Sequence, residues 1–206
     1  DIVVLAVKPQ DLRMAMAGIK GKLTSVQAVL SIVAGARINT ITSGINHQAV
    51  IRVMPNTPAQ IGLAASVWTA TQAVVPERLE DAKNLIEAIG EEIYVTDEKY
   101  VDMATGLSGS GPAYVFMFIE SLTDAGVHVG LTRDMAAKLA VQTVFGSAQL
   151  VRQSGLHPAE LRNMVTSPGG TTAEGTLVLE GAGFRTSVIE AVTAAYEKTL
   201  LLGEEE

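Results

Sequence analysis

The sequence predicts an α/β domain followed by an all-α domain, and two observations lead to this fold class. Short runs rich in β-branched residues alternate with helical patterns up to about residue 96, which is typical of a doubly wound parallel sheet. From residue 97 onward, almost every segment has helical periodicity. The 206 residues, 48% of them hydrophobic, are enough to form the cores of one or two domains.

Three apolar runs predict the central strands of the sheet. They cover residues 2–7, 28–33 and 50–54, and the first is apolar on both faces, as in strands that helices cover on both sides. A helix is expected over residues 10–19, where apolar residues recur at intervals of three and four, and a shorter helix over residues 38–45. The alternation of these elements indicates βαβ units.

Two more strands, over residues 64–68 and 92–95, flank a helix over residues 76–89, whose first turn tolerates Pro76. The first strand begins directly after Asp1 without a turn or cap, and one edge of the sheet lacks an evident partner. We therefore expect a further strand–helix unit to precede Asp1 in the native gene product.

The second half predicts a bundle of about five helices, over residues 111–125, 133–153, 158–165, 171–179 and from about 186 into the acidic tail at 204–206. Thr132 is placed to cap the second helix, because a threonine before a helix accepts a backbone N–H of its first turn. Thr171 and Glu174 have the spacing of a capping box for the fourth.

The composition excludes several classes of protein. With 15 basic and 22 acidic residues, the net charge is −7, and no basic stripe is present for nucleic-acid binding. The absence of cysteine excludes disulfides, thiolate zinc sites and a cysteine nucleophile, and it agrees with a reducing cytoplasm. No apolar run approaches the roughly 20 residues that cross a bilayer. We expect a cytoplasmic protein with no membrane or nucleic-acid partner.

The ends of the first two strands are candidate ligand sites, since open α/β sheets bind ligands outside the carboxyl ends of their strands. Residues 7–9 and 33–35 include small or rigid residues, which let a ligand lie against the backbone. Lys8 either adds a positive charge to this site or is a solvated loop lysine without a role in it. Residues 55–58, Pro-Asn-Thr-Pro, form either a rigid turn or the wall of a ligand site.

The segment over residues 166–172 is the most suggestive chemically. Two glycines precede a helix N-terminus, so that backbone amides point outward without side chains in front of them and favour a carboxylate or phosphate. Serine and threonine hydroxyls add hydrogen bonds, including one to a substrate nitrogen. The alternative is a loop followed by a capping box.

Other polar segments carry less information. The glycine-rich residues 108–112 follow a helical pattern instead of a strand, and we interpret them as a tight turn before a helix, not as a phosphate cradle. The carboxylate pairs Asp97–Glu98 and Glu91–Glu92 are interpreted as solvated ends of elements. The three histidines lack the spacing of metal ligands, and no metal is expected.

Five stretches, in the same order along almost the whole chain, resemble pyrroline-5-carboxylate reductase, the last enzyme of proline biosynthesis. They cover residues 6–10, 52–58, 105–114, 124–131 and 165–172. The strings Ser-Gly-Ser-Gly-Pro-Ala-Tyr at 108–114 and Thr-Ser-Pro-Gly-Gly-Thr-Thr at 166–172 are specific to that family.

The resemblance implies an oxidoreductase with a partial Rossmann-type NAD(P)-binding domain over residues 1–96 and a helical dimerisation and substrate domain over residues 97–206. The family transfers hydride from NADPH or NADH to the C=N carbon of 1-pyrroline-5-carboxylate, giving L-proline. Its members are homodimers, and some assemble dimers into decamers. The family's first strand and glycine-rich loop, with the residue that distinguishes NADPH from NADH, precede the position of Asp1.

The resemblance also implies roles for single residues. Those that line the cofactor are Ala6, Val7, Lys8, Pro9, Ile32, Val33, Ala34 and Asn163. Those that hold the substrate are Ser167, Gly169, Gly170, Thr171 and Thr172. Thr172 is the catalytic candidate, hydrogen-bonded to the ring nitrogen. A protonated imine is already electrophilic, so that the reaction depends on positioning more than on a strong base.

Two other functions remain open from the sequence. One is a related imine or 2-hydroxyacid reductase of the same architecture, which needs different residues at 171–172. The other is a non-catalytic helical dimerisation module that binds no nicotinamide.

Overall fold

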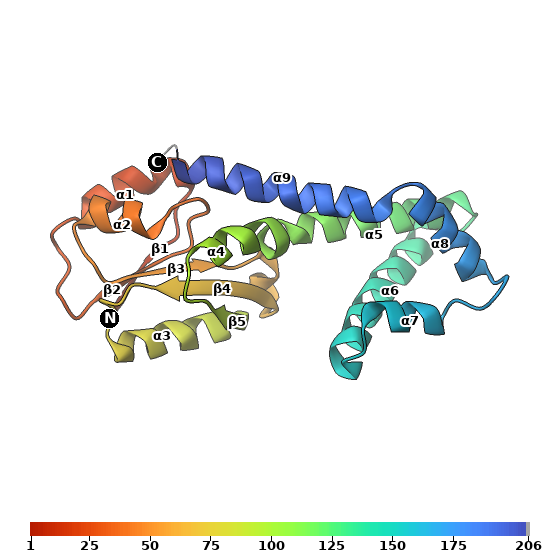
Figure 1. Cartoon of the computed structure of the whole chain (residues 1–206), viewed down its shortest axis with the longest axis horizontal. Coiled ribbons are helices and arrows are strands. Elements are labelled where there is room, and N and C mark those ends of the chain that lie inside the picture. The colour runs from red at the N-terminus through yellow and green to blue at the C-terminus, as the bar shows by residue number, and fades with distance from the viewer. Residues whose placement is uncertain (205–206) are drawn as a thin grey trace. The chain divides into compact units, whose positions relative to one another are not determined.

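The computed structural model describes residues 1–204 of the chain (Figure 1). Glu205 and Glu206 of the predicted acidic tail lie outside the described residues. Contacts within the chain define two compact units, one formed by residues 1–112 together with those from 191 onward, and one by residues 113–190. The domain boundary predicted between residues 96 and 97 stays a prediction.

The first unit contains a five-stranded sheet in the order β1-β2-β3-β4-β5. Its strands are β1 (Ile2–Leu5), β2 (Ala28–Ser31), β3 (Val50–Met54), β4 (Ala64–Ala70) and β5 (Gly90–Tyr94). β1, β2 and β3 are parallel, as predicted, and β5 is parallel to β4.

β4 is antiparallel to β3, which corrects the prediction of an all-parallel sheet. The reason is the connection between them, which holds only the short 3₁₀ segment η2 (Thr57–Ile61). A parallel pair needs a crossover of about a dozen residues or more, usually a helix, that returns the chain to the starting edge. The chain instead turns back directly into β4.

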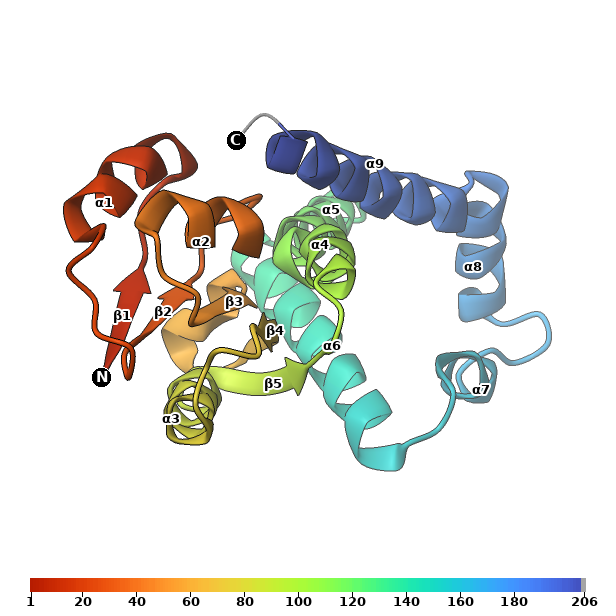
Figure 2. The same ribbon diagram turned by 60° about the vertical axis from the view of Figure 1, so that its left-hand side comes forward.

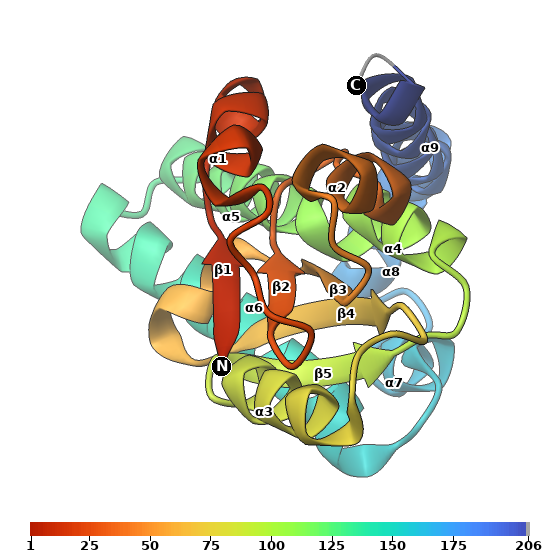
Figure 3. The ribbon, with the colours of Figure 1, turned by 90° about the vertical axis from the view of Figure 1, so that its left-hand side faces the viewer.

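Helices cover both faces of this sheet (Figure 3). The 3₁₀ segment η1 (Pro9–Asp11), α1 (Leu12–Ile19) and α2 (Ile38–Ile45) lie on one face, and α3 (Pro76–Glu87) lies on the other. On the first face, Ile41 and Ile45 pack with Val29, and on the second face Trp68 packs with Ile86. Burial of each such side chain contributes about 1.5–3 kcal/mol before entropy is counted.

The glycine-rich segment is helical, so the predicted tight turn is wrong. α4 (Lys99–Ala104) continues through the π-helical turn η3 (Thr105–Gly109) into α5 (Gly111–His128). The Ser110 amide donates to the Thr105 carbonyl at 2.9 Å, the i to i+5 bond of a π-turn. A Cβ on Gly106 would lie 2.8 Å from the carbonyl oxygen of Val192, so that glycine at this position allows the close approach of α9.

The second unit contains helices, of which α6 (Arg133–Ser154), α7 (Pro158–Met164) and α8 (Thr171–Gly181) are complete within it. α9 (Phe184–Glu204) begins in this unit. The described residues after 97 thus form six α-helices instead of the predicted five or so. The helix that was not predicted is α4, whose six residues are too few to show a helical repeat of apolar positions.

One predicted cap is confirmed and one is wrong. The Thr132 hydroxyl accepts the amide of Met135 at the start of α6, at 3.4 Å. α8 has Gly170 at its N-cap without a side-chain cap, and Thr171 is already the first helical residue. The capping box of Thr171 and Glu174 therefore does not form, because the helix begins one residue earlier than that motif requires.

Large apolar side chains are exposed along the helices of the second unit. Examples from α5, α6 and α8 are Phe116, Met117, Phe145, Leu177 and Val178. Exposed apolar side chains in such number are typical of a protein–protein interface. Among the described residues, no helix has the length and apolar character needed to span a membrane.

Candidate functional site

The residues predicted to line the cofactor in the first unit gather at one edge of the sheet. Ala6 to Pro9 follow β1, and Ile32 to Ala34 follow β2, its parallel neighbour. The Ile32 amide donates to the Leu5 carbonyl at 3.1 Å, so that the two segments leave the sheet side by side. The side chains of Ala6, Val7 and Lys8 are exposed there.

Val33 differs from its neighbours, because its side chain is buried in the core between the sheet and α1 and α2. Its amide donates to the Ser31 hydroxyl at 3.2 Å. Gly35 has a φ of 80°, a conformation that favours glycine, and turns the chain toward α2. A cofactor at this edge would meet the backbone of Val33, not its side chain.

The residues predicted to hold the substrate lie together in the second unit (Figure 2). Ser167, Gly169 and Gly170 form the loop between α7 and α8, and Thr171 and Thr172 open α8. The Gly170 amide donates to the Ser167 carbonyl at 3.0 Å. Since the first amides of a helix have no acceptor within it, this loop and the start of α8 present donors suited to a carboxylate.

Asn163, predicted to contact the cofactor, lies on α7 and lines a cleft of about 330 Å³ between α7 and α8. Glu180 also lines this cleft, and its carboxylate accepts Nε of Arg185 at 2.8 Å. This hydrogen bond lowers the pKa of Glu180, which keeps the carboxylate ionised. Arg162, also in the lining, lies 3.7 Å from the same oxygen.

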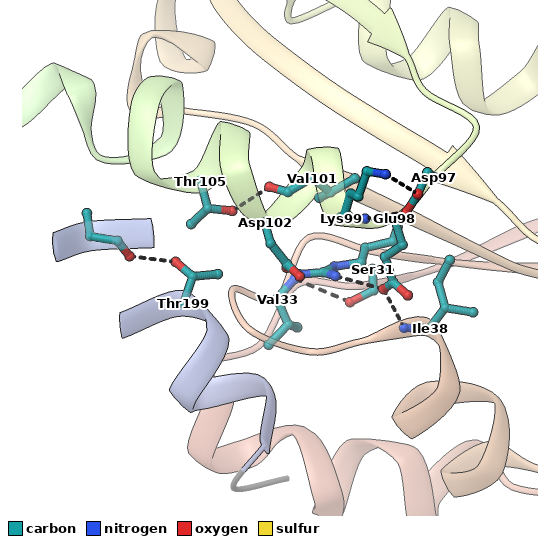
Figure 4. Close-up of polar contacts among 12 residues, drawn as sticks. Ser31, Val33, Ile38, Asp97, Glu98, Lys99, Val101, Asp102, Thr105 and Thr199 are labelled. Carbon is teal, nitrogen blue, oxygen red and sulfur yellow. Dashed lines mark hydrogen bonds and ion pairs between the residues drawn. The ribbon is translucent and has the colours of Figure 1, made fainter. Parts of the chain in front are cut away.

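A cluster in the first unit escaped the sequence analysis. The guanidinium of Arg52, on β3, contacts the carboxylates of Glu98 and Asp102 at 2.7 and 2.6 Å (Figure 4). The Arg52 side chain is only 2% exposed. The interpretation of Glu98 as a solvated end is therefore wrong, whereas Asp97 is exposed and pairs with Lys99.

The hydrogen bond from Lys99 lowers the pKa of Asp97. A signal for the buried cluster was present in the sequence, because an arginine within an apolar strand needs a buried counter-charge. The sequence did not show which of the many carboxylates supplies it.

The Pro-Asn-Thr-Pro segment is held as a rigid turn. The amide group of Asn56 donates to the Ser108 carbonyl of η3, and its oxygen accepts the Ala65 amide of β4, both at 3.0 Å. The hydrogen bond from Asn56 to Ser108 thus connects two of the stretches that resemble the family, residues 52–58 and 105–114. Because Asn56 is held by these two hydrogen bonds, the structure supports the interpretation of residues 55–58 as a rigid turn.

Comparisons with known proteins agree with this fold and these motifs. The family model described as pyrroline-5-carboxylate reductase dimerisation matches residues 98–202. The pyrroline-5-carboxylate reductase of Synechocystis sp. is 46% identical over 204 residues, 99% of this chain and 76% of that protein. This chain belongs to the pyrroline-5-carboxylate reductase family.

Other reductases of the family show the same extent of similarity. That of Escherichia coli is 42% identical over 97% of this chain and 74% of its own length. The crystal structure of the Plasmodium falciparum enzyme, with NADP bound, superimposes with a TM-score of 0.93 at 36% identity, over 98% of this chain and 77% of that one. The predicted family is therefore confirmed, with its α/β domain followed by a helical dimerisation domain.

Family membership also explains the exposed apolar surface. The matched dimerisation range includes the helices α5, α6 and α8, whose large apolar side chains are exposed in the isolated chain. A dimer buries such a surface, and the family's substrate is a small molecule. The site residues predicted from the resemblance stay predictions.

Proposed function

We propose that this protein reduces 1-pyrroline-5-carboxylate to L-proline with hydride from NADPH or NADH, the last step of proline biosynthesis. The observation that carries this proposal is the similarity over 99% of the chain to a reductase of that name. The chain is accordingly an oxidoreductase of the NAD(P)H-dependent class, and a solved relative has NADP bound.

The strand ends of the first unit fit a dinucleotide. Ala6 and Ala34 are small, and Gly35 turns the backbone away with a φ of 80°, so that a flat ring or a ribose has room against the chain. The exposed Lys8 supplies a cation for a phosphate or hydroxyl group. We assign cofactor binding to Ala6–Pro9, to Ile32–Ala34 and, in the second unit, to Asn163. When bound, the cofactor supplies the hydride.

The loop between α7 and α8 fits the substrate. We assign the substrate carboxylate to the amides of Gly169 and Thr171 and to the Ser167 hydroxyl, while Gly170, whose amide donates to the Ser167 carbonyl, leaves the approach free of a side chain. The Thr172 hydroxyl accepts the N–H of the protonated imine and orients the ring. Because that proton is already on the ring nitrogen, hydride addition to carbon gives the neutral amine of proline without a further proton donor.

A cofactor titration separates this proposal from the non-catalytic alternative. NADPH fluorescence, followed as protein from the native start codon is added, should saturate at one nicotinamide per subunit. A folded dimer that binds neither NADPH nor NADH would favour the dimerisation module. A protein that binds NADPH but does not turn over 1-pyrroline-5-carboxylate would favour a related imine reductase.

We further propose a homodimer as the basic unit, with a decamer of five such dimers as the alternative assembly, and a cytoplasmic location with no nucleic-acid or membrane partner. The absence of cysteine supports a reducing compartment. Sedimentation velocity distinguishes dimer from decamer directly.

A further inference from the structure

The segment between β2 and α2 carries three of the residues assigned to the cofactor and ends at the N-terminus of α2. That N-terminus lacks a local cap, because Arg37 at the N-cap position makes no side-chain cap hydrogen bond. The first turn of α2 also contains no acidic residue. The amides at the start of a helix need acceptors, which here must come from elsewhere in the fold.

Glu98 supplies that acceptor from a distant part of the sequence. Its Oε1 accepts the amide of Ile38, the first residue of α2, at 2.8 Å, although the two residues are 60 positions apart. A carboxylate at this place also interacts favourably with the helix dipole. Figure 4 shows the side chain of Glu98, the N-cap residue of α4, reaching toward Ile38.

Arg52 fixes the position of Glu98. One guanidinium nitrogen donates to the same Oε1 of Glu98 at 2.7 Å, and the other donates to Asp102 at 2.6 Å. Because Arg52 lies in the central strand β3 and is almost fully buried, it is a rigid anchor for both carboxylates. Asp102 and Glu98 therefore both pair with Arg52, but only the hydrogen bond of Glu98 reaches the Ile38 amide.

The opposite end of the same segment is held by the sheet. Arg52 is paired in register with Ser31, the last residue of β2. The Ser31 hydroxyl accepts the amide of Val33 at 3.2 Å. The segment from Ile32 to Arg37 is thus fixed at its start through Ser31 and at its end through Glu98.

We propose that Glu98 is a positioning residue for the cofactor. Through its hydrogen bond to the Ile38 amide it fixes the β2–α2 segment, and with it the backbone of Ile32, Val33 and Ala34 that meets the dinucleotide. Arg52 holds Glu98 in place. Glu98 itself touches neither cofactor nor substrate. This inference rests on the proposed function, because it requires that those three residues bind NAD(P)H.

The test compares Glu98→Met with Asp102→Leu in protein expressed from its own start codon. Each variant removes one carboxylate partner of Arg52 and replaces it with an apolar side chain of similar size, and both should lower the melting temperature. Only Glu98→Met also removes the acceptor for Ile38. The dissociation constant for NADPH, measured by fluorescence titration, should rise about tenfold in Glu98→Met and less than twofold in Asp102→Leu.

Hydrogen exchange gives a readout that does not depend on activity. Amides of residues 33–41 should exchange faster in Glu98→Met and remain protected in Asp102→Leu. Glu98→Gln keeps an oxygen that accepts the Ile38 amide, and it should recover most of the NADPH affinity. The KM for 1-pyrroline-5-carboxylate at saturating NADPH should change less than twofold. If Glu98→Met does not fold, Glu98→Ala makes the same comparison.

Equal weakening of NADPH binding in the Glu98 and Asp102 variants would show that the cluster acts only on stability, and it would overturn the inference. Unchanged NADPH binding in Glu98→Met, beside a wild type that binds NADPH, would overturn the inference and leave the proposed function intact. A wild-type protein that does not bind NADPH would overturn the proposed function and the inference with it.

Discussion

Thr172 is the second residue of α8, in a helix whose first turn has no side-chain cap. If its hydroxyl orients the ring nitrogen, Thr172→Ala should lower kcat about tenfold or more, which is the effect of losing one hydrogen bond in the transition state. Steady-state kinetics with 1-pyrroline-5-carboxylate measure the change. Thr172→Ser, which keeps the hydroxyl, is the matched control and should retain most of the activity. Equal kcat values for the alanine variant and wild type would remove Thr172 from the site.

Glu180 provides a prediction about pH. Its pKa is lowered by the hydrogen bond from Arg185, so that the ion pair stabilises the folded protein at pH values above the ordinary glutamate pKa of about 4.5. This contribution should disappear as the pH falls through the lower pKa of the folded state. The melting temperatures of wild type and Glu180→Gln, measured from pH 7 to pH 3, should converge below about pH 4.5. A difference that grew on acidification would contradict the assigned pKa direction.

Single residues were predictable where their partners are local in sequence. The cap by Thr132 needs only an amide three residues away, and it is confirmed. The capping box at Thr171 was wrong by one residue, since glycine at 170 occupies the N-cap. Glu98 was misinterpreted because its partner Arg52 is 46 positions away, and only the tertiary fold brings them together.

Among the elements, η3 makes a close contact with α9. A Cβ on Gly106 would lie 2.8 Å from the Val192 carbonyl oxygen and 3.0 Å from the Tyr196 amide nitrogen, both backbone atoms of a helix. Gly106→Ala should therefore force the helices apart and lower the free energy of unfolding by about 1–3 kcal/mol. Urea denaturation measures the loss.

Gly111→Ala is the matched control for this change. A Cβ at Gly111 meets no atom within 4 Å, and the residue lies at the start of the helix α5. This variant should be as stable as wild type or slightly more stable, because alanine favours helix. An equal loss of stability in both variants would show that the contact with α9 is not the cause.

Elements with a strong local pattern were predicted well, and those set by tertiary contacts were not. The helix at 38–45 and the strand at 50–54 have the predicted bounds. The orientation of β4 depends on the length of its connection to β3, which the apolar pattern of the strands does not encode. The continuation of α4 through η3 was missed because glycines at 106, 109 and 111 disfavour helix locally, while the packing of α9 favours it.

For the whole molecule, the exposed apolar helices of the second unit predict a dimer. Phe116 on α5 is 60% exposed in the single chain. Phe116→Asp places a charge on this surface and should convert the dimer to monomer in sedimentation velocity at micromolar concentration. Met14→Asp, on α1 and 75% exposed outside the dimerisation range, should stay dimeric. A Phe116→Asp protein that sediments as a dimer would place the interface elsewhere.

The candidate site residues form one group in each unit of the chain. The strand ends at 6–9 and 32–34 belong to the first unit, and Asn163 with residues 167–172 belongs to the second. General rules predicted residues 7–9 and 33–35, as strand ends, and residues 166–172, as a loop before a helix N-terminus, whereas Ala6, Ile32 and Asn163 were implied only by the family resemblance. The roles within each group came from the family resemblance, because amides and hydroxyls lack the spacing that marks a metal site or a catalytic dyad.

The most direct test of the central claim follows the hydride itself. Protein from the native start codon is mixed with 1-pyrroline-5-carboxylate and NADPH that carries deuterium at both C4 positions, and the proline formed is analysed by mass spectrometry. The account predicts one proline per NADPH oxidised, each with a single deuterium on the former C=N carbon. Unlabelled proline, or NADPH oxidation without proline, would contradict it.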